Sequence, residues 1–325
     1  MSLVKVAIAI YNVSKSFDLE KESELPLCLF PDKELEAFFK DKVSKTHLPK
    51  QLQKKVIFLI RPISFEVEKW KMRHSKILDL NVDLQKFLSW KSEGTIDRHR
   101  TAMKLIQNDI LPISKSFVLA CLYCLSEFAE SLWIRMSELQ RRQLVYENEL
   151  SPSLVKYYIA KLQGRNIELR VDYCHTVIAF RYLLAQLTPE QRKISVLFVV
   201  RLNSQDTHVL RYCLSQMEKN EQAKVFENYP LQVLSCFLEW PWQPFFIEVA
   251  NQLWDYLPKY NFCSFLEFIL NERIVPGWKD FDYEELLLQF WCQSPSNFKD
   301  YVKQDRNFDI ELLTRILNRR QFQLS

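Results

Sequence analysis

The segment FVLACLYCLSEFAESL, residues 117–132, places apolar side chains three and four positions apart along its whole length. On an α-helix with 3.6 residues per turn, side chains at these spacings lie on one face. That face consists of Phe117, Ala120, Cys121, Cys124, Phe128 and Leu132. The spacing predicts one amphipathic helix over the segment, with its apolar face in a protein core.

The same spacing recurs along most of the chain, and strand-like alternation is rare. Helix starts carry capping motifs: in Thr188-Pro189-Glu190-Gln191, a capping hydroxyl is followed by proline and by a glutamine that can reach back to the cap amide. Asp282 and Glu285 show the same spacing. The stretch 194–200 is β-branched enough for a strand, yet it follows the Thr188 helix start. The chain is predicted to be all-α, an irregular, solenoid-like array of stacked antiparallel helix pairs.

Glycine is scarce, with only three among 325 residues. Average usage is about 7%. Rossmann turns, P-loops and nucleophile elbows need glycine for positive φ and for close approach of the backbone to a ligand. The composition therefore argues against these enzyme classes. Gly164 follows an apparent helix and is expected to end it in the left-handed conformation.

The expected organisation is an N-terminal helical region, 1–145, and a C-terminal helical region, 146–325, unless the two form one continuous array. No low-complexity linker divides the chain. The polar stretch 140–148 is the expected boundary, and Gly164-Arg165-Asn166 is a second candidate.

Positive charge is concentrated in residues 41–104, which hold 15 Lys and Arg against 7 Asp and Glu in a chain of net charge +4. Within this region, the run 69–76 interleaves basic and aromatic residues, an arrangement that suits a phosphate backbone or an anionic membrane surface. The alternative is a helix at the edge of the core, with extended basic side chains reaching to solvent. The candidate interaction residues of this run are Lys69, Trp70, Lys71, Arg73 and Lys76.

The most unusual string is Trp240-Pro241-Trp242-Gln243-Pro244-Phe245-Phe246. If exposed, Trp240 and Trp242 could clamp a proline-rich peptide or stack on nucleic-acid bases, so both are candidate interaction residues. The favoured interpretation is a rigid corner, in which one helix ends near Trp240 and Phe245 and Phe246 lead the next helix into the core.

Cysteine and histidine offer no recognisable reactive site. Cys121 and Cys124 form a C-x-x-C pair on an apolar face, where buried structural thiols are expected. All eight cysteines are expected to be reduced, since a chain with a full core has little need of disulfides. The five histidines show no spacing typical of metal ligands.

The densest carboxylate cluster, Asp280, Asp282, Glu284 and Glu285, is interpreted as a solvated helix start. A magnesium site would need a second acidic motif across a cavity, and none occurs. No catalytic, cofactor-binding or metal-ligating residue is assigned, and no cofactor is expected.

Several strings together resemble a large, lineage-expanded family of uncharacterised arthropod proteins, best represented in spiders. They are SEGTID at 92–97 followed by Ala102, Leu105, Ile106 and Gln107, LACLYCL at 119–125, FLEWPWQ at 237–243 and IVPGWKDFDY at 274–283. The resemblance covers about residues 1 to 305. It implies a helical architecture and supplies no activity, cofactor or catalytic residue.

The expected function is that of a non-catalytic helical scaffold or protein-interaction module with a protein partner, since stacked helix pairs expose extended grooves. The alternatives are a nucleic-acid-binding helical-repeat protein that uses residues 41–104, and an all-α enzyme whose site is assembled from distant residues. No signal peptide or transmembrane segment is recognised, which favours an intracellular, cytoplasmic protein.

Overall fold

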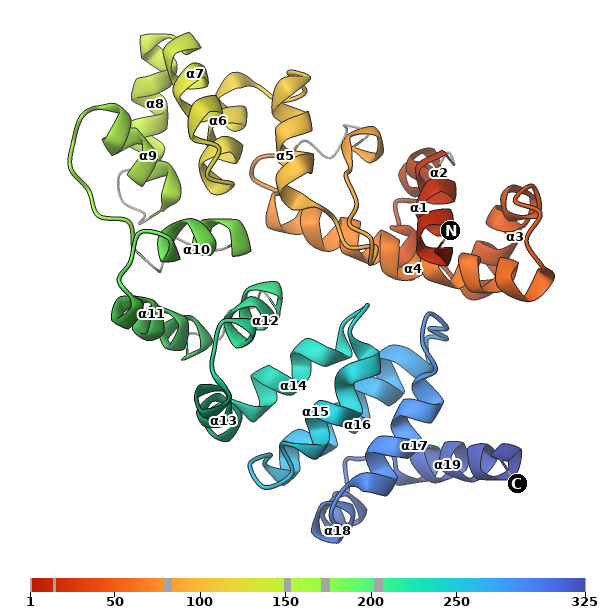
Figure 1. The fold of residues 1–325 in the computed structure, drawn as a ribbon. Coiled ribbons are helices and arrows are strands. Elements are labelled where there is room, and N and C mark those ends of the chain that lie inside the picture. Colours follow the sequence, from red (N-terminus) through yellow and green to blue (C-terminus); the bar gives the residue numbers. More distant parts are fainter. Residues whose placement is uncertain are drawn as a thin grey trace. The chain divides into compact units, whose positions relative to one another are not determined.

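The structure is a computed structural model, and it describes residues 2–13, 16–78, 84–148, 153–170, 176–201 and 207–324. Within these residues it contains 19 α-helices, and the only extended pairing is a single antiparallel bridge between Trp90 and Ile96 (Figure 1). The predicted all-α class is therefore confirmed. No helix in these ranges is both long enough and apolar enough to cross a membrane.

The chain forms two compact units. Unit 1 comprises Met1–Glu68, Ser92–Thr95 and Ala223–Ser325, and unit 2 comprises Lys69–Lys91 and Ile96–Gln222. The expected division into 1–145 and 146–325 does not coincide with these bounds. The polar stretch 140–148 lies within helix α8 (Glu138–Asn148), which buries Leu144, so its polarity marks a solvated helix face.

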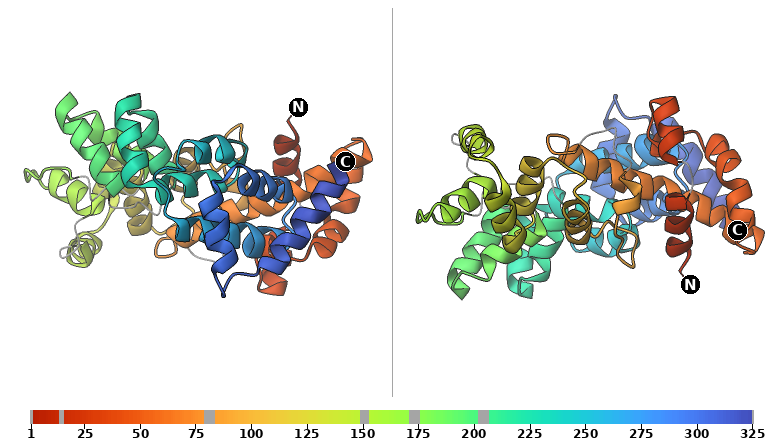
Figure 2. Two further views of the ribbon diagram at one scale, coloured as in Figure 1. Left: turned by 90° about the horizontal axis from the view of Figure 1, so that it is seen from below. Right: turned by 90° about the horizontal axis from the view of Figure 1, so that it is seen from above.

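Unit 1 joins the N-terminal and C-terminal helices of the chain. Its helices are α1 (Leu3–Val13), α2 (Ser16–Ser23), α3 (Asp32–Ser44), most of α4 (Lys50–Arg73), part of α13 (Lys219–Asn228), α14 (Pro230–Leu238), α15 (Phe246–Asn251), α16 (Lys259–Ile269), α17 (Tyr283–Gln293), α18 (Ser296–Gln304) and α19 (Ile310–Leu324) (Figure 2). A π-helical turn, Leu270–Ile274, follows α16. Phe246, Phe262 and Phe290 meet in the core, with ring centroids 5.0 and 4.9 Å from Phe290.

Unit 2 is built from the middle of the chain. Its helices are α5 (Arg98–Gln107), α6 (Ile113–Leu122), α7 (Ser126–Arg135), α8, α9 (Leu154–Leu162), α10 (Val177–Leu184), α11 (Pro189–Arg201) and α12 (Thr207–Ser215). The stretch 194–200 is helical within α11. The Thr188 capping box forms as expected: the Gln191 amide donates to Thr188 Oγ1 over 3.3 Å, and the Thr188 amide donates to Gln191 Oε1 over 3.0 Å.

The predicted single helix over 117–132 is wrong, because the chain turns between α6 and α7. Cys124 has a φ of 53°, and the Leu125 amide donates to Ala120 O over 2.9 Å, which closes the last turn of α6. Asp109 ends α5 in the same conformation, and Gly164 ends α9 as predicted, with φ values of 49° and 71°. A chain poor in glycine thus uses other residues at some left-handed helix ends.

Candidate functional site

The seven sequence-predicted interaction residues are divided between the two units. Those of the run 69–76 belong to unit 2, whereas Trp240 and Trp242 belong to unit 1. Lys69 and Lys71 are half-buried, and Arg73 and Lys76 are exposed. Trp70 is completely buried, so its inclusion in an interaction surface is wrong.

Trp70 belongs to a buried hydrogen-bonded ring with Tyr123 and His74. Trp70 Nε1 donates to the Tyr123 hydroxyl over 3.1 Å, and that hydroxyl lies 3.1 Å from His74 Nε2. His74 Nδ1 lies 2.8 Å from Trp70 O, an arrangement that suits a neutral imidazole protonated at Nδ1. Burial lowers the pKa of His74 to about 4. Because each polar side-chain atom of the three residues has a partner, this ring is part of the core.

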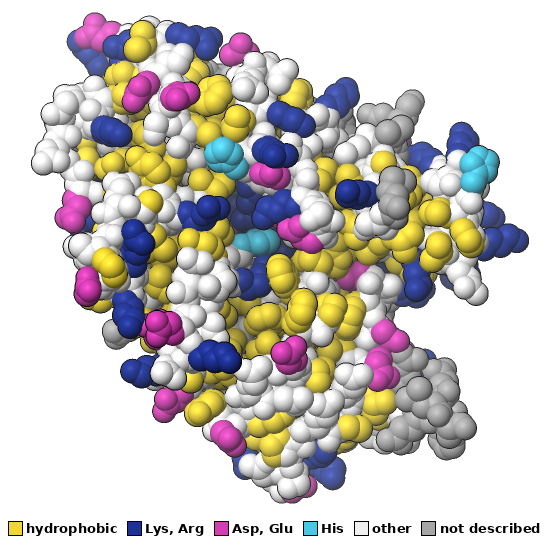
Figure 3. Space-filling view, viewed as in Figure 1, with side chains coloured by type: hydrophobic (Ala, Val, Ile, Leu, Met, Phe, Trp, Pro, Cys, Tyr) yellow, Lys and Arg dark blue, Asp and Glu magenta, His cyan; other side chains and the backbone are white. Residues whose placement is uncertain are grey.

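A basic cluster surrounds His208 in unit 2. Burial lowers the pKa of His208 well below its usual value, and the positive charges of Arg98, Arg211, Lys69 and Lys91 lower it further. Arg211 Nη2 lies 3.2 Å from His208 Nδ1. Figure 3 shows Lys and Arg side chains gathered with histidine near the centre of the displayed face. The basic region 41–104 supplies three of the four cations, whereas Arg211 comes from a distant helix that sequence reasoning missed.

The tryptophan string in unit 1 forms the predicted corner. Helix α14 ends at Leu238, and α15 begins at the buried Phe246, although Phe245 remains exposed. Trp240 is half-buried and packs closely against Gly94, where an added Cβ would lie 2.3 Å from Trp240 Cη2. Trp242 is likewise half-buried, so the corner covers part of the surface of both tryptophans.

The more site-like feature of unit 1 is a pocket of about 850 Å³ beside the start of α17. Apolar side chains from α1, α4 and the chain before α17 form most of its wall, together with a few charged groups. The lining residues include Val4, Lys55, Phe58, Trp278, Lys279 and Asp280. Its volume lies within the range of small-molecule sites.

Asp280 is the unusual residue of this pocket. Its Oδ2 accepts from the Tyr283 hydroxyl over 3.3 Å and from Gln243 Nε2 over 3.4 Å, whereas its buried Oδ1 has no hydrogen-bond partner. Burial raises the pKa of Asp280 to about 6, although the nearby Arg273 opposes the shift. A buried carboxylate oxygen without a partner is costly and calls for an explanation.

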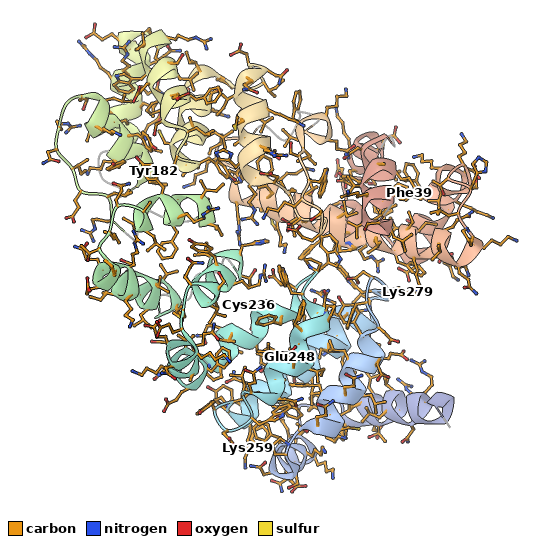
Figure 4. All side chains as sticks on the ribbon, viewed as in Figure 1. Phe39, Tyr182, Cys236, Glu248, Lys259 and Lys279 are labelled. Atoms are coloured by element: carbon orange, nitrogen blue, oxygen red, sulfur yellow. The ribbon has the colours of Figure 1, made fainter. Side chains whose placement is uncertain are left out.

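A second group of charges adjoins the pocket, and Lys279 is one of the pocket's lining residues. The buried Arg61 pairs with Asp32 over 3.0 Å and donates to Gly277 O over 3.2 Å. Lys279, labelled in Figure 4, pairs with the same Asp32 over 2.7 Å. The Arg273 guanidinium lies 4.5 Å from the centre of the Trp278 ring. The Nε atoms of Arg61 and Arg273 are, like Asp280 Oδ1, buried without a hydrogen-bond partner.

The interpretation of the acidic cluster is correct for Asp282 and wrong for Asp280. Asp282 Oδ1 accepts from the Glu285 amide over 3.0 Å and caps α17 as expected. Asp280 is instead enclosed by Gln243 and Tyr283. Gln243 lies 37 residues before Asp280 and 40 residues before Tyr283 in the sequence, so this enclosure depends on a contact between distant segments. The local sequence gave no signal of this contact.

A second pocket, of about 740 Å³, lies in unit 2 among α10, α11, α12 and the chain leading into α13. Charged groups of both signs line it, and among them Lys193 pairs with Glu221 over 2.7 Å. Beside it, Ile194, Leu197 and Phe198 on α11 have exposed fractions of 68%, 41% and 43%. We call these three residues the α11 stripe.

Among the described residues, no three His, Cys, Asp or Glu side chains are placed to hold a metal ion. The seven described cysteines all carry reduced thiols, and Cys174 lies outside the described residues. No protein-family model matches the sequence, and the searches of curated proteins and of solved structures gave no match.

Proposed function

We propose that the chain is a helical protein-interaction module and that the α11 stripe, with the adjacent pocket, is its docking surface. The observation that carries the proposal is the exposure of three large apolar side chains on one helix. Ile194, Leu197 and Phe198 are spaced three and four positions apart, so they form one continuous ridge. Exposed apolar patches beside polar residues are typical of protein–protein contacts.

The occupant that fits this surface is an amphipathic segment of a partner protein. The pocket beside the ridge can receive apolar side chains, and its lining residues offer both signs of charge. Arg181 and Arg192 can pair with acidic residues, and Glu190 and Glu218 with basic ones. A solenoid-like stacking of helix pairs would present such a groove to a partner helix.

The test uses charge substitutions on the ridge. A partner is first captured from native extract by affinity purification and crosslinking, then identified, purified and titrated against the full chain. Leu197→Glu and Phe198→Glu are expected to weaken its binding at least tenfold, because each places a charge in an apolar contact. Ile134→Glu is the matched control, since Ile134 is 74% exposed in the same unit but on α7.

Equal loss of binding in all three variants, or no loss in the two α11 variants, would contradict the proposal. A second contradiction would come from light scattering. If the purified chain alone formed a dimer that Phe198→Glu dissociates, the occupant would be a second copy of the chain and not a separate partner.

The basic cluster around His208 favours a second candidate function, the binding of a nucleic acid. The positive charges of Arg98, Arg211, Lys69 and Lys91 all lower the pKa of the half-buried His208 imidazole, so positive charge is concentrated there. Binding of a fluorescent single-stranded oligonucleotide should then weaken steeply with salt, and Arg98→Ala should reduce the slope of log K against log salt by about one. A salt-independent affinity, or an unchanged slope in Arg98→Ala, would rule this candidate out.

A further inference from the structure

A third pocket, of about 380 Å³, lies in unit 1 among the last three helices of the chain, α17, α18 and α19 (Figure 1). We call it the C-terminal pocket. Trp291, Ile310 and Leu317 supply apolar surface to its wall. Lys299 and Lys303 are the only charged residues among the described ones that line it. Its volume is that of a site for a small molecule.

The two lysines are placed at the pocket by α18. They are four positions apart, so they lie on one face of this helix. Lys299 Nζ donates to Cys292 O, a carbonyl in the last turn of α17, over 3.1 Å, and Lys303 is exposed. In the described part of the chain, neither lysine forms an ion pair with an acidic residue.

The acidic residues of the same two helices and of the turn between them lie outside the pocket lining. Asp305 Oδ1 and Asp309 Oδ1 accept hydrogen bonds from backbone amides over 2.9 and 2.8 Å. Asp300 on α18 and Glu311 on α19 are exposed and do not line the pocket. A cationic ligand would therefore meet two like charges here and no carboxylate of a described lining residue, whereas an anionic ligand would meet two opposite charges.

We propose that the C-terminal pocket binds a small carboxylate with an apolar body. The carboxylate pairs with Lys299 and Lys303, and the side-chain amide of Asn318, which also lines the pocket, can donate a further hydrogen bond to it. The apolar body packs against Trp291 and Leu317. Apolar surface supplies affinity in such sites, and the few polar groups fix the orientation of the ligand. This inference does not depend on the docking surface of unit 2.

Cys292 reports whether the pocket is occupied, because it is exposed and lines the same pocket. Iodoacetamide, an uncharged reagent, alkylates the thiolate with release of iodide, and mass spectrometry of the peptide containing Cys292 gives the rate in the full chain. 2-Naphthoate is expected to slow this reaction at a concentration roughly fivefold lower than 2-naphthamide, which has the same body without the negative charge. Absence of protection by 2-naphthoate, or equal protection by the two probes, would overturn the proposal.

Three variants test whether the pocket lysines cause this preference. Lys303→Gln should lower the preference for 2-naphthoate about twofold, because one of the two charges is lost, whereas Lys303→Arg should keep it. Lys54→Gln is the matched control, since Lys54 is an exposed lysine of the same unit that does not line the pocket. Each rate is divided by the rate of the same variant without probe, which removes any change in thiol reactivity. An unchanged preference in Lys303→Gln, or an equal loss in Lys54→Gln, would show that the pocket lysines do not bind the carboxylate.

Discussion

Two groups of buried polar side chains, one in each unit, differ in how completely they are hydrogen-bonded. In unit 2, Trp70, Tyr123 and His74 form a ring in which each polar side-chain atom has a partner. In unit 1, Asp280 Oδ1 and the Nε atoms of Arg61 and Arg273 are buried without one. A fully bonded network rigidifies a core, whereas an incompletely bonded one is destabilising unless something else completes it.

This difference in hydrogen bonding indicates separate roles for the Trp70–Tyr123–His74 ring and for the polar group around Asp280. The ring of unit 2 is explained by folding alone, which removes Trp70 from any surface. The group around Asp280 leaves three buried polar atoms without a partner, and Asp280 itself lines a pocket of unit 1. Burial of polar residues is therefore not enough to mark a site; the informative feature is a buried polar atom that lacks a partner.

The largest expected effect is an opposite dependence of stability on pH. The pKa of Asp280 is raised from 3.8 to about 6, so between these values the native state binds more protons and stability falls as pH rises. The pKa of His74 is lowered from 6.5 to about 4, so between these values the unfolded state binds more protons and stability rises with pH. Each contribution is roughly 3 kcal/mol.

Urea unfolding of the wild type, Asp280→Asn and His74→Gln at pH 4.5 and pH 7 measures both contributions. As pH rises, the wild type should lose stability relative to Asp280→Asn and gain it relative to His74→Gln. Glu218→Gln, on the exposed surface of unit 2, controls for the loss of one carboxyl group. If the change in wild-type stability between pH 4.5 and pH 7 had the same sign relative to both variants, the predicted opposite pH dependence would be wrong.

A smaller difference in unfolding free energy is expected when one polar group is removed from each of the two networks. Tyr123→Phe removes the central hydroxyl of the ring and leaves Trp70 Nε1 and His74 Nε2 without it, so the free energy of unfolding should fall by about 2 kcal/mol. Asp280→Leu removes a group that is only half bonded, and Gln243 and Tyr283 keep their own 3.0 Å contact. Its cost at pH 7 should stay below about 1 kcal/mol. Denaturant titration of both variants is the measurement, and equal costs would mean that the networks are equally structural.

The smallest expected effects on stability concern two helix ends of unit 2. They measure the cost of backbone strain by itself, apart from the cost of burying polar atoms. Asp109 and Gly164 have similar positive φ values, 49° and 71°. Asp109→Gly should stabilise the chain by about 0.5–1 kcal/mol, and Gly164→Ala should destabilise it by about 1 kcal/mol, although no atom lies within 4 Å of the added Cβ. Thermal unfolding of both variants should show shifts of opposite sign; shifts of the same sign would refute the strain argument.

Local patterns predicted the helices because spacing and caps are local properties. The Thr188 box and the Asp282 cap both form where the sequence places them. The break between α6 and α7 escaped prediction because the apolar stripe of 117–132 continues across the turn, and Cys124 carries no glycine-like signal for a positive φ.

The candidate sites were less predictable because they depend on contacts between distant segments. Asp280 is buried by Gln243 and Tyr283, and Arg211 joins cations from more than 100 residues earlier in the chain. The α11 stripe had a partial signal, since the apolar stretch 194–200 has too many large side chains for one buried helix face. Its exposure is set by which neighbouring helices cover it.

The most direct test of the docking surface is photocrosslinking at position 198. Phe198 is replaced by p-benzoylphenylalanine, and the same replacement at Ile134, exposed on α7, is the control. We predict a discrete crosslinked product between the chain and one partner protein from position 198, and no such product from position 134. The same products from both positions, or only crosslinks between copies of the chain, would contradict the account.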